Sequence, residues 1–308
     1  MILHKCNCVT VCGVGLQNCR RAHLKVRFDI NARVCGIAYL DDDVSKIYVI
    51  CGNWNTICVF HAAPPYEQLR GISMNGLREP TDIAACADNK LLYVSDHAEG
   101  CVWQVTTGGK VDKRLPTWAP IKRKASSVYP VSLSVGFGRV VVVEIGKILV
   151  YDLHDDKVDE IDFPDSVALH HAMETDRRSY VVALSDKSAE IPYSTVREMY
   201  RDERGEWLPG RECNLQSCVT SPTHNLPMYM ARDTSGFFYV AIRGSRKVLV
   251  LDKELNVVQS VRLNKRSMPN RLCFLAQRQK QLLVADAGFG VNVYDGVAGT
   301  SPVQYPKN

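Results

Sequence analysis

The hydrophobic positions of this chain recur as one phrase: an apolar residue, Tyr-Val or a close variant, a small polar loop, and an alternating apolar stretch. Counted from Tyr48, the copies follow at about 45 residues, with one gap of about 60 between Tyr180 and Tyr239. A step of this size is typical of a four-stranded propeller blade, so the pattern predicts one closed repeat fold. The copies lie at 47–60, 92–103, 140–151, 180–185, 238–251 and 282–294.

Each copy is preceded by a short apolar stretch, which in four cases begins at a proline: Pro80, Pro130, Pro227 and Pro269. We interpret this stretch as the inner strand of a blade, because a proline at the first residue of a strand removes no ladder donor. A turn, the Tyr-Val strand, an alternating third strand and a more polar fourth strand follow. The sequence therefore predicts an all-β fold, a six-bladed β-propeller with four-stranded blades.

The two ends of the chain are expected to close the ring. The stretch 23–30 alternates like a strand but has no first half of its own, and 302–305 reads as a weak last strand. We expect the first of these to complete the final blade, since closure leaves only short, protected edges. A β-sandwich or a two-domain chain is the alternative architecture.

The predicted organisation is a Cys-rich segment over 1–22 and a single six-bladed propeller over 23–308. An insertion at about 193–224 accounts for the one long gap. Within it, Ser194–Arg204 is the only candidate for a helix.

Composition narrows the class of protein further. With 46% hydrophobic and 23% charged residues, the chain is an ordinary globular one. The net charge of +5, from 38 Lys and Arg against 33 Asp and Glu, permits a polyanionic partner without requiring one.

The sequence around the twelve cysteines argues against a secreted disulfide framework. The start lacks the features of a signal peptide, no Asn-x-Ser/Thr acceptor occurs, and no apolar run is long enough to cross a bilayer. We therefore expect a cytoplasmic protein with reduced thiols, no membrane contact and no disulfide-linked partner.

Three of the copies resemble the NHL repeat, a blade motif of metazoan propellers. The likeness rests on Pro80-Thr-Asp-Ile-Ala with Leu92-Tyr-Val-Ser-Asp, on Pro269-Asn-Arg-Leu-Cys with Leu283-Val-Ala-Asp, and on the copy from Pro227, where Ile242 replaces the motif's Asp. The stretch 163–172 is also similar to uncharacterised tripartite-motif-like proteins of invertebrates. The resemblance implies a propeller that binds protein or RNA. RING, B-box and coiled-coil patterns are missing, so it does not imply ubiquitin-ligase activity.

In a propeller, the loops that enter the inner strands and the loops between the second and third strands lie on one face, the loop face. We expect this face to bind the partner. The first set of loops contributes Arg33, Asp82, His170, His171, Tyr229, Asn270 and Arg271, and the second contributes Asn53, Trp54, Asn55, His97, Glu99, Lys147, Lys187, Arg243, Arg246, Lys247 and Phe289.

The favoured function is a non-enzymatic scaffold that binds protein through this face, with no catalytic residue and no cofactor. The alternative is single-stranded RNA, because Trp54, Tyr229 and Phe289 could stack on bases among basic residues. Asp96 and Asp286 open polar loops, where we expect their carboxylates to bond backbone amides and shape the turns.

A metal-dependent hydrolase or lyase is the remaining alternative. Histidines at 97, 170, 171 and 224 could hold zinc, but adjacent histidines in a strand point to opposite faces. Asn270 and Asp82 alone do not make a calcium cage. Cys6, Cys8, Cys12 and Cys19 are weak metal candidates, since their spacing matches no standard zinc knuckle and the segment reads equally well as an edge strand.

Overall fold

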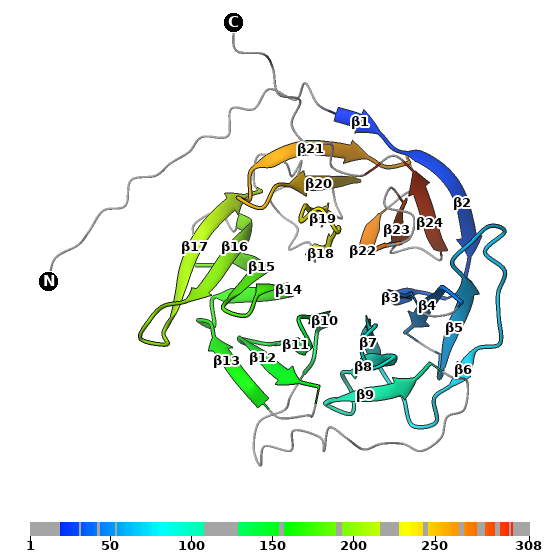
Figure 1. The fold of residues 1–308 in the computed structure, drawn as a ribbon, viewed down its shortest axis with the longest axis horizontal. Helices are drawn as coiled ribbons and strands as arrows, with labels where there is room; N and C mark the ends of the chain where they lie inside the picture. The colour runs from blue at the N-terminus through cyan, green and yellow to red at the C-terminus, as the bar shows by residue number, and fades with distance from the viewer. Residues whose placement is uncertain are drawn as a thin grey trace, which may run out of the picture.

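In a computed structural model, the chain forms a ring of six small β-sheets around one central axis (Figure 1). Each sheet is one blade, with its strands ordered from the axis outward. The predicted six-bladed propeller is therefore confirmed. The structure describes residues 19–30, 32–41, 44–52, 54–107, 129–153, 157–188, 193–215, 228–242, 246–264, 268–275, 281–286, 290–295 and 297.

Blades 1 to 3 follow in chain order, each with its first strand nearest the axis. Within the described part of blade 2 there are three strands. Blade 1 holds β3 (Val34–Leu40), β4 (Lys46–Cys51), β5 (Thr56–His61) and β6 (Ile72–Ser73), blade 2 holds β7 (Pro80–Cys86), β8 (Leu91–Asp96) and β9 (Cys101–Thr106), and blade 3 holds β10 (Ser132–Gly136), β11 (Arg139–Glu144), β12 (Lys147–Asp152) and β13 (Lys157–Asp162).

Blades 4 to 6 repeat the arrangement, and two N-terminal strands join the last two of them. Blade 4 holds β14 (Val167–Asp176), β15 (Ser179–Asp186), β16 (Tyr193–Arg201) and β17 (Trp207–Asn214), blade 5 holds β18 (Met228–Arg232), β19 (Phe238–Ile242), β20 (Lys247–Leu251), β21 (Val257–Arg262) and β1 (Cys19–Arg21), and blade 6 holds β22 (Pro269–Phe274), β23 (Gln281–Asp286), β24 (Gly290–Asp295) and β2 (His23–Asp29).

The hydrophobic core is divided into six clusters, one between each pair of neighbouring blades. Alternate residues of a second strand serve opposite neighbours: Leu92 of β8 packs with Tyr48 of blade 1, whereas Tyr93 packs with Leu133 of blade 3. Both faces of the strand are therefore covered, which explains why the Tyr-Val strands are apolar throughout instead of alternating.

The tyrosines of the repeated phrase are buried, and in two blades the hydroxyl is bonded to a polar residue of the turn before its strand. The Tyr93 hydroxyl accepts a hydrogen bond from Asn89 Nδ2 at 2.8 Å, and the Tyr239 hydroxyl donates to Asp233 Oδ2 at 3.0 Å. A buried phenol needs such a partner. This accounts for tyrosine at these positions, where phenylalanine would fill the same space.

The N-terminal strand closes the ring as expected, by joining the last blade (Figure 1). Strand β2 pairs antiparallel with β24, with His23 opposite Asp295. Phe28 of β2 stacks on Phe60 of blade 1 at a centroid distance of 5.1 Å. In addition, β1 pairs in parallel with the outer strand of blade 5, so the N-terminal stretch links two blades. The strand expected at 302–305 lies outside the described residues.

One expectation is corrected. Residues 193–214 are not an insertion, because they form β16 and β17, the outer strands of blade 4, and the helix candidate Ser194–Arg204 falls mostly within β16. All eight residues of β15 pair with β16. This pairing, with Thr195 and Val196 buried, overrides the weak helical pattern. Residues 216–227 lie outside the described part.

Candidate functional site

The inner strands lie nearest the axis, and four of them carry a β-bulge close to their first residue. The extra residue of each bulge breaks the pairing register, so that the following residue turns inward. The bulges fall at Cys35, Thr81, His170 and Asn270, and the residues that follow are Gly36, Asp82, His171 and Arg271.

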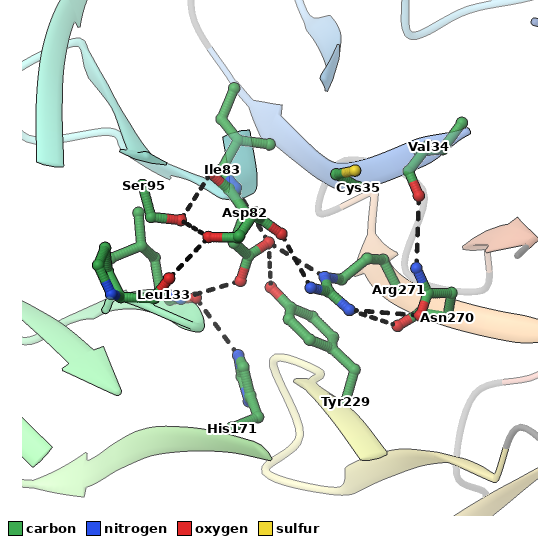
Figure 2. A network of polar contacts seen from close by, with 12 residues as sticks. Val34, Cys35, Asp82, Ile83, Ser95, Leu133, His171, Tyr229, Asn270 and Arg271 are labelled. Atoms are coloured by element: carbon green, nitrogen blue, oxygen red, sulfur yellow. Dashed lines mark hydrogen bonds and ion pairs between the residues drawn. The ribbon is translucent and has the colours of Figure 1, made fainter. Parts of the chain in front are cut away.

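Asp82 lies at the centre of this axial network (Figure 2). Its side chain is fully buried, with 0% exposure, and its carboxylate receives hydrogen bonds from three other blades. The donors are Leu133 N at 2.9 Å, Arg271 Nε at 3.3 Å and the Tyr229 hydroxyl at 3.5 Å. Burial raises the pKa of Asp82 and the Arg271 guanidinium opposes that rise.

All three nitrogens of the Arg271 guanidinium donate hydrogen bonds. Its Nη2 donates to Thr81 O at 2.9 Å and its Nη1 to Asn270 O at 3.1 Å. The guanidinium carbon lies 4.8 Å from the centroid of the Tyr229 ring, within cation–π range. Asn270 continues the network to blade 1, where its Nδ2 donates to Val34 O at 3.3 Å.

His171 completes the network in blade 4. Its Nε2 donates to Leu133 O at 3.3 Å, and its ring lies 3.9 Å from the Tyr229 ring, centroid to centroid. Burial lowers the pKa of His171 to about 3 and raises that of Tyr229 well above 10. With its contact to Val34 of blade 1, the network joins all six blades, and Asp82, His171, Tyr229 and Asn270 are buried within it.

We expect His171→Gln to flatten the pH dependence of stability. Above pH 6.5 the imidazole is neutral in both states, but below 6.5 only the unfolded chain takes up the proton, down to about pH 3. The folded state therefore loses stability as the pH falls. Urea unfolding near pH 7 and near pH 4.5 should show that wild type loses about 2 to 3 kcal/mol more than the variant. Equal losses would contradict a buried neutral His171.

His170 and Ser185 form a contact that resembles a nucleophile and its base, with Nε2 and Oγ 2.8 Å apart. Blade 2 has the same contact between its own bulge residue and second strand, where Thr81 Oγ1 lies 2.8 Å from Ser95 Oγ. Because a threonine takes the place of the histidine there, the contact is a repeated structural feature of the bulge.

The predicted loop-face residues separate into three groups, and the buried group requires a correction. Asp82, His171, Tyr229 and Asn270 are buried in the axial network and do not belong to an exposed surface. A bulge turns Asp82 and His171 inward, whereas Tyr229 lies in an inner strand whose register is unbroken. Asn53, Arg243 and Phe289 lie outside the described residues. The exposed or half-buried members are Arg33, Trp54, Asn55, His97, Glu99, Lys147, His170, Lys187, Arg246, Lys247 and Arg271.

Apolar side chains on the loop face were missed by sequence reasoning. Ile145, in the turn between β11 and β12, is 72% exposed, and Tyr129 and Met268 precede inner strands and are also exposed. The Tyr129 ring packs against the His97 ring in a tilted arrangement, with the two centroids 4.7 Å apart. An isoleucine in the centre of the turn Glu-Ile-Gly-Lys was the available signal, since turn centres are usually polar.

Asp96 shapes the loop face of blade 2 as expected of a turn-forming carboxylate. It accepts hydrogen bonds from the amides of Arg78 at 2.9 Å, Glu79 at 3.0 Å and Glu99 at 3.3 Å. Asp286 accepts one from Asn292 Nδ2, while its loop at 287–289 lies outside the described residues.

The cysteines at positions 35, 51, 58, 86, 101, 213 and 273 are free thiols. Burial raises the pKa of Cys51 and of Cys101 to about 12, so neither is a ready nucleophile or metal ligand. Among the described residues, no group of three or more His, Cys, Asp or Glu is placed to hold a metal ion. Cys6, Cys8 and Cys12 lie outside those residues, and Cys19 is the first residue of β1.

No family model matches the chain, and no curated protein matches it. Solved structures share its fold. Hydrazine synthase of Kuenenia stuttgartiensis matches with a TM-score of 0.58 and 15% identity, covering 89% of this chain and 98% of that one. Virginiamycin B lyase from Staphylococcus aureus matches with 0.58 and 11%, covering 89% and 99%. A chain of the Mitotic Checkpoint Complex matches with 0.58 and 8%, covering 90% and 93%. At these identities the likeness shows the propeller fold alone.

In the described part of the chain, no helix is long and apolar enough to cross a membrane.

Proposed function

We propose that this propeller is a scaffold that binds a protein partner through its loop face. The observation that carries the proposal is the contrast between the axis and that face. The axis is filled by side chains bonded to one another, whereas the loop face presents apolar side chains and charges of both signs to solvent. Protein interfaces combine such apolar anchors with a polar rim.

The charges on this face support a protein more than a nucleic acid. In blade 2 the Arg78 side chain is paired with Glu99 at 2.7 Å, and in blade 3 Lys147 Nζ lies 3.4 Å from Glu160. In these two blades the mixed charge differs from the clustered positive charge typical of non-specific nucleic-acid binding. The likeness to a chain of the Mitotic Checkpoint Complex, by its name an assembly of proteins, is consistent with the proposal.

We propose further that the blades are of the NHL type. The support is the combination of an inner strand opened by proline, as at Pro80 and Pro269, with an Asp at the end of the second strand, as at Asp96 and Asp286. An alignment of close homologues that kept these positions would test this assignment.

We expect Ile145→Asp to lower capture of partner proteins on the order of tenfold, because an exposed apolar anchor is replaced by a charge. The measurement is quantitative affinity capture from cell extract. The matched control is Phe137→Asp, in the turn between β10 and β11 at the opposite end of the same blade, where the side chain is 54% exposed. Both variants should melt close to wild type. If both variants captured less partner protein to the same extent, or if neither captured less, the loop face would not be the binding surface.

A further inference from the structure

Cations face one another across neighbouring strands at the loop-face end of blade 5. Lys247, the first residue of β20, is in register with Arg262, the last residue of β21. Side chains of registered residues lie on the same face of a sheet, and like charges placed directly opposite are destabilising.

Arg246 extends this group and has an unfavourable backbone. Its φ of 54° lies in the left-handed region that non-glycine residues rarely adopt. We refer to Arg246, Lys247 and Arg262 as the cation row.

The equivalent position in blade 3 shows what an ordinary pairing looks like. Lys147 is the first residue of β12, as Lys247 is of β20, and its register partner is Asp162. Its Nζ also lies 3.4 Å from Glu160. In blade 3 the lysine at this position is therefore paired with acids. In blade 5 the equivalent lysine, Lys247, is instead opposite an arginine.

Within the described part of the chain, no side chain of the cation row takes part in an ion pair or a hydrogen bond. The sequence offers few acids nearby: from 234 to 285 there are 10 Lys and Arg against two acids, Asp252 and Glu254. Both acids lie in the turn between β20 and β21, at the other end of the blade. Asp252 Oδ1 is engaged there by the amides of Glu254 at 3.1 Å and Asn256 at 2.7 Å.

We propose that the cation row binds an acidic segment, rich in Asp and Glu, of a partner protein. The proposal rests on the proposed function and assigns the acidic part of that partner to blade 5. Three cations without counterions repel one another, and an anionic ligand relieves that repulsion. A protein segment is favoured over RNA because, among the described residues of blades 5 and 6, no aromatic side chain is exposed for base stacking, whereas Met268 is 49% exposed.

The test measures the binding of a fluorescein-labelled peptide of alternating glutamate and serine, by anisotropy at low and at high salt. Wild type should bind at low salt and release the peptide at high salt. Lys247→Gln and Arg262→Gln should each weaken binding roughly fivefold and also raise the melting temperature by a few degrees, because each removes a repulsion. The matched control is Lys253→Gln, in the same blade at the opposite end, which should change neither quantity.

Three results would overturn the proposal: no binding by wild type, equal binding by all variants, or tighter binding of a labelled oligouridylate that the same two substitutions abolish. The first two leave the proposed function intact if Ile145→Asp still loses partner proteins. A different outcome is also informative: the Lys247 and Arg262 variants lose peptide binding, but the Ile145 variant captures partner proteins as well as wild type. That outcome would support the cation row as an acidic-peptide site and would reject Ile145 as part of the protein-binding surface.

Discussion

Replacing Gly36 by alanine should lower the free energy of unfolding by several kcal/mol, since its new methyl group has no space. A Cβ built on Gly36 would lie 2.6 Å from Ile83 N and 3.0 Å from the carbonyl carbon of Asp82. Both are backbone atoms of β7, so blades 1 and 2 would have to move apart. Denaturant unfolding measures the change.

The control for this substitution is Gly136→Ala, at the end of another inner strand. There the nearest atom to a new Cβ is Glu174 Cβ, at an ordinary contact distance of 3.5 Å. Alanine at this position should be neutral or slightly stabilising, because it restricts the unfolded chain more than glycine does. If Gly36→Ala were as stable as Gly136→Ala, the close approach of β3 to β7 would be wrong.

Removing one partner of the buried pair Asp82–Arg271 should cost about 3–5 kcal/mol, because the other charge stays buried without compensation. In Arg271→Met the Asp82 carboxylate loses the one cation that pairs with it among the described residues, and in Asp82→Asn the guanidinium likewise loses its one described anion. The double variant should be less destabilised than the sum of the two single variants by at least about 1 kcal/mol. Chemical unfolding of the four proteins gives this coupling energy.

The matched control is the exposed pair Lys25–Asp295, whose charged atoms lie 3.2 Å apart with both side chains more than a third exposed. Lys25→Met should cost less than about 1 kcal/mol, since solvent screens an exposed ion pair. Strictly additive effects of the Asp82 and Arg271 substitutions would show that the axial network does not couple the blades.

The candidate site was only partly predictable. Sequence reasoning selected Asp82, His171 and Tyr229 because they follow the start of an inner strand, and it correctly placed that strand near the axis. It assigned Asp82 and His171 to an exposed surface because a β-bulge leaves no trace in the pattern of apolar residues: the extra residue at Thr81 or His170 looks like any other strand position.

The sequence by itself determined the number of blades, the strand order within a blade and the closure by the N-terminal strand. These follow from a repeated local pattern of apolar residues, turns and prolines, which is present in the order of the residues. Only the tertiary structure decided which polar side chains meet at the axis and which cations face one another, as Lys247 faces Arg262. Those contacts depend on strand register and on the distance between blades, and both are set by packing between segments far apart in the chain.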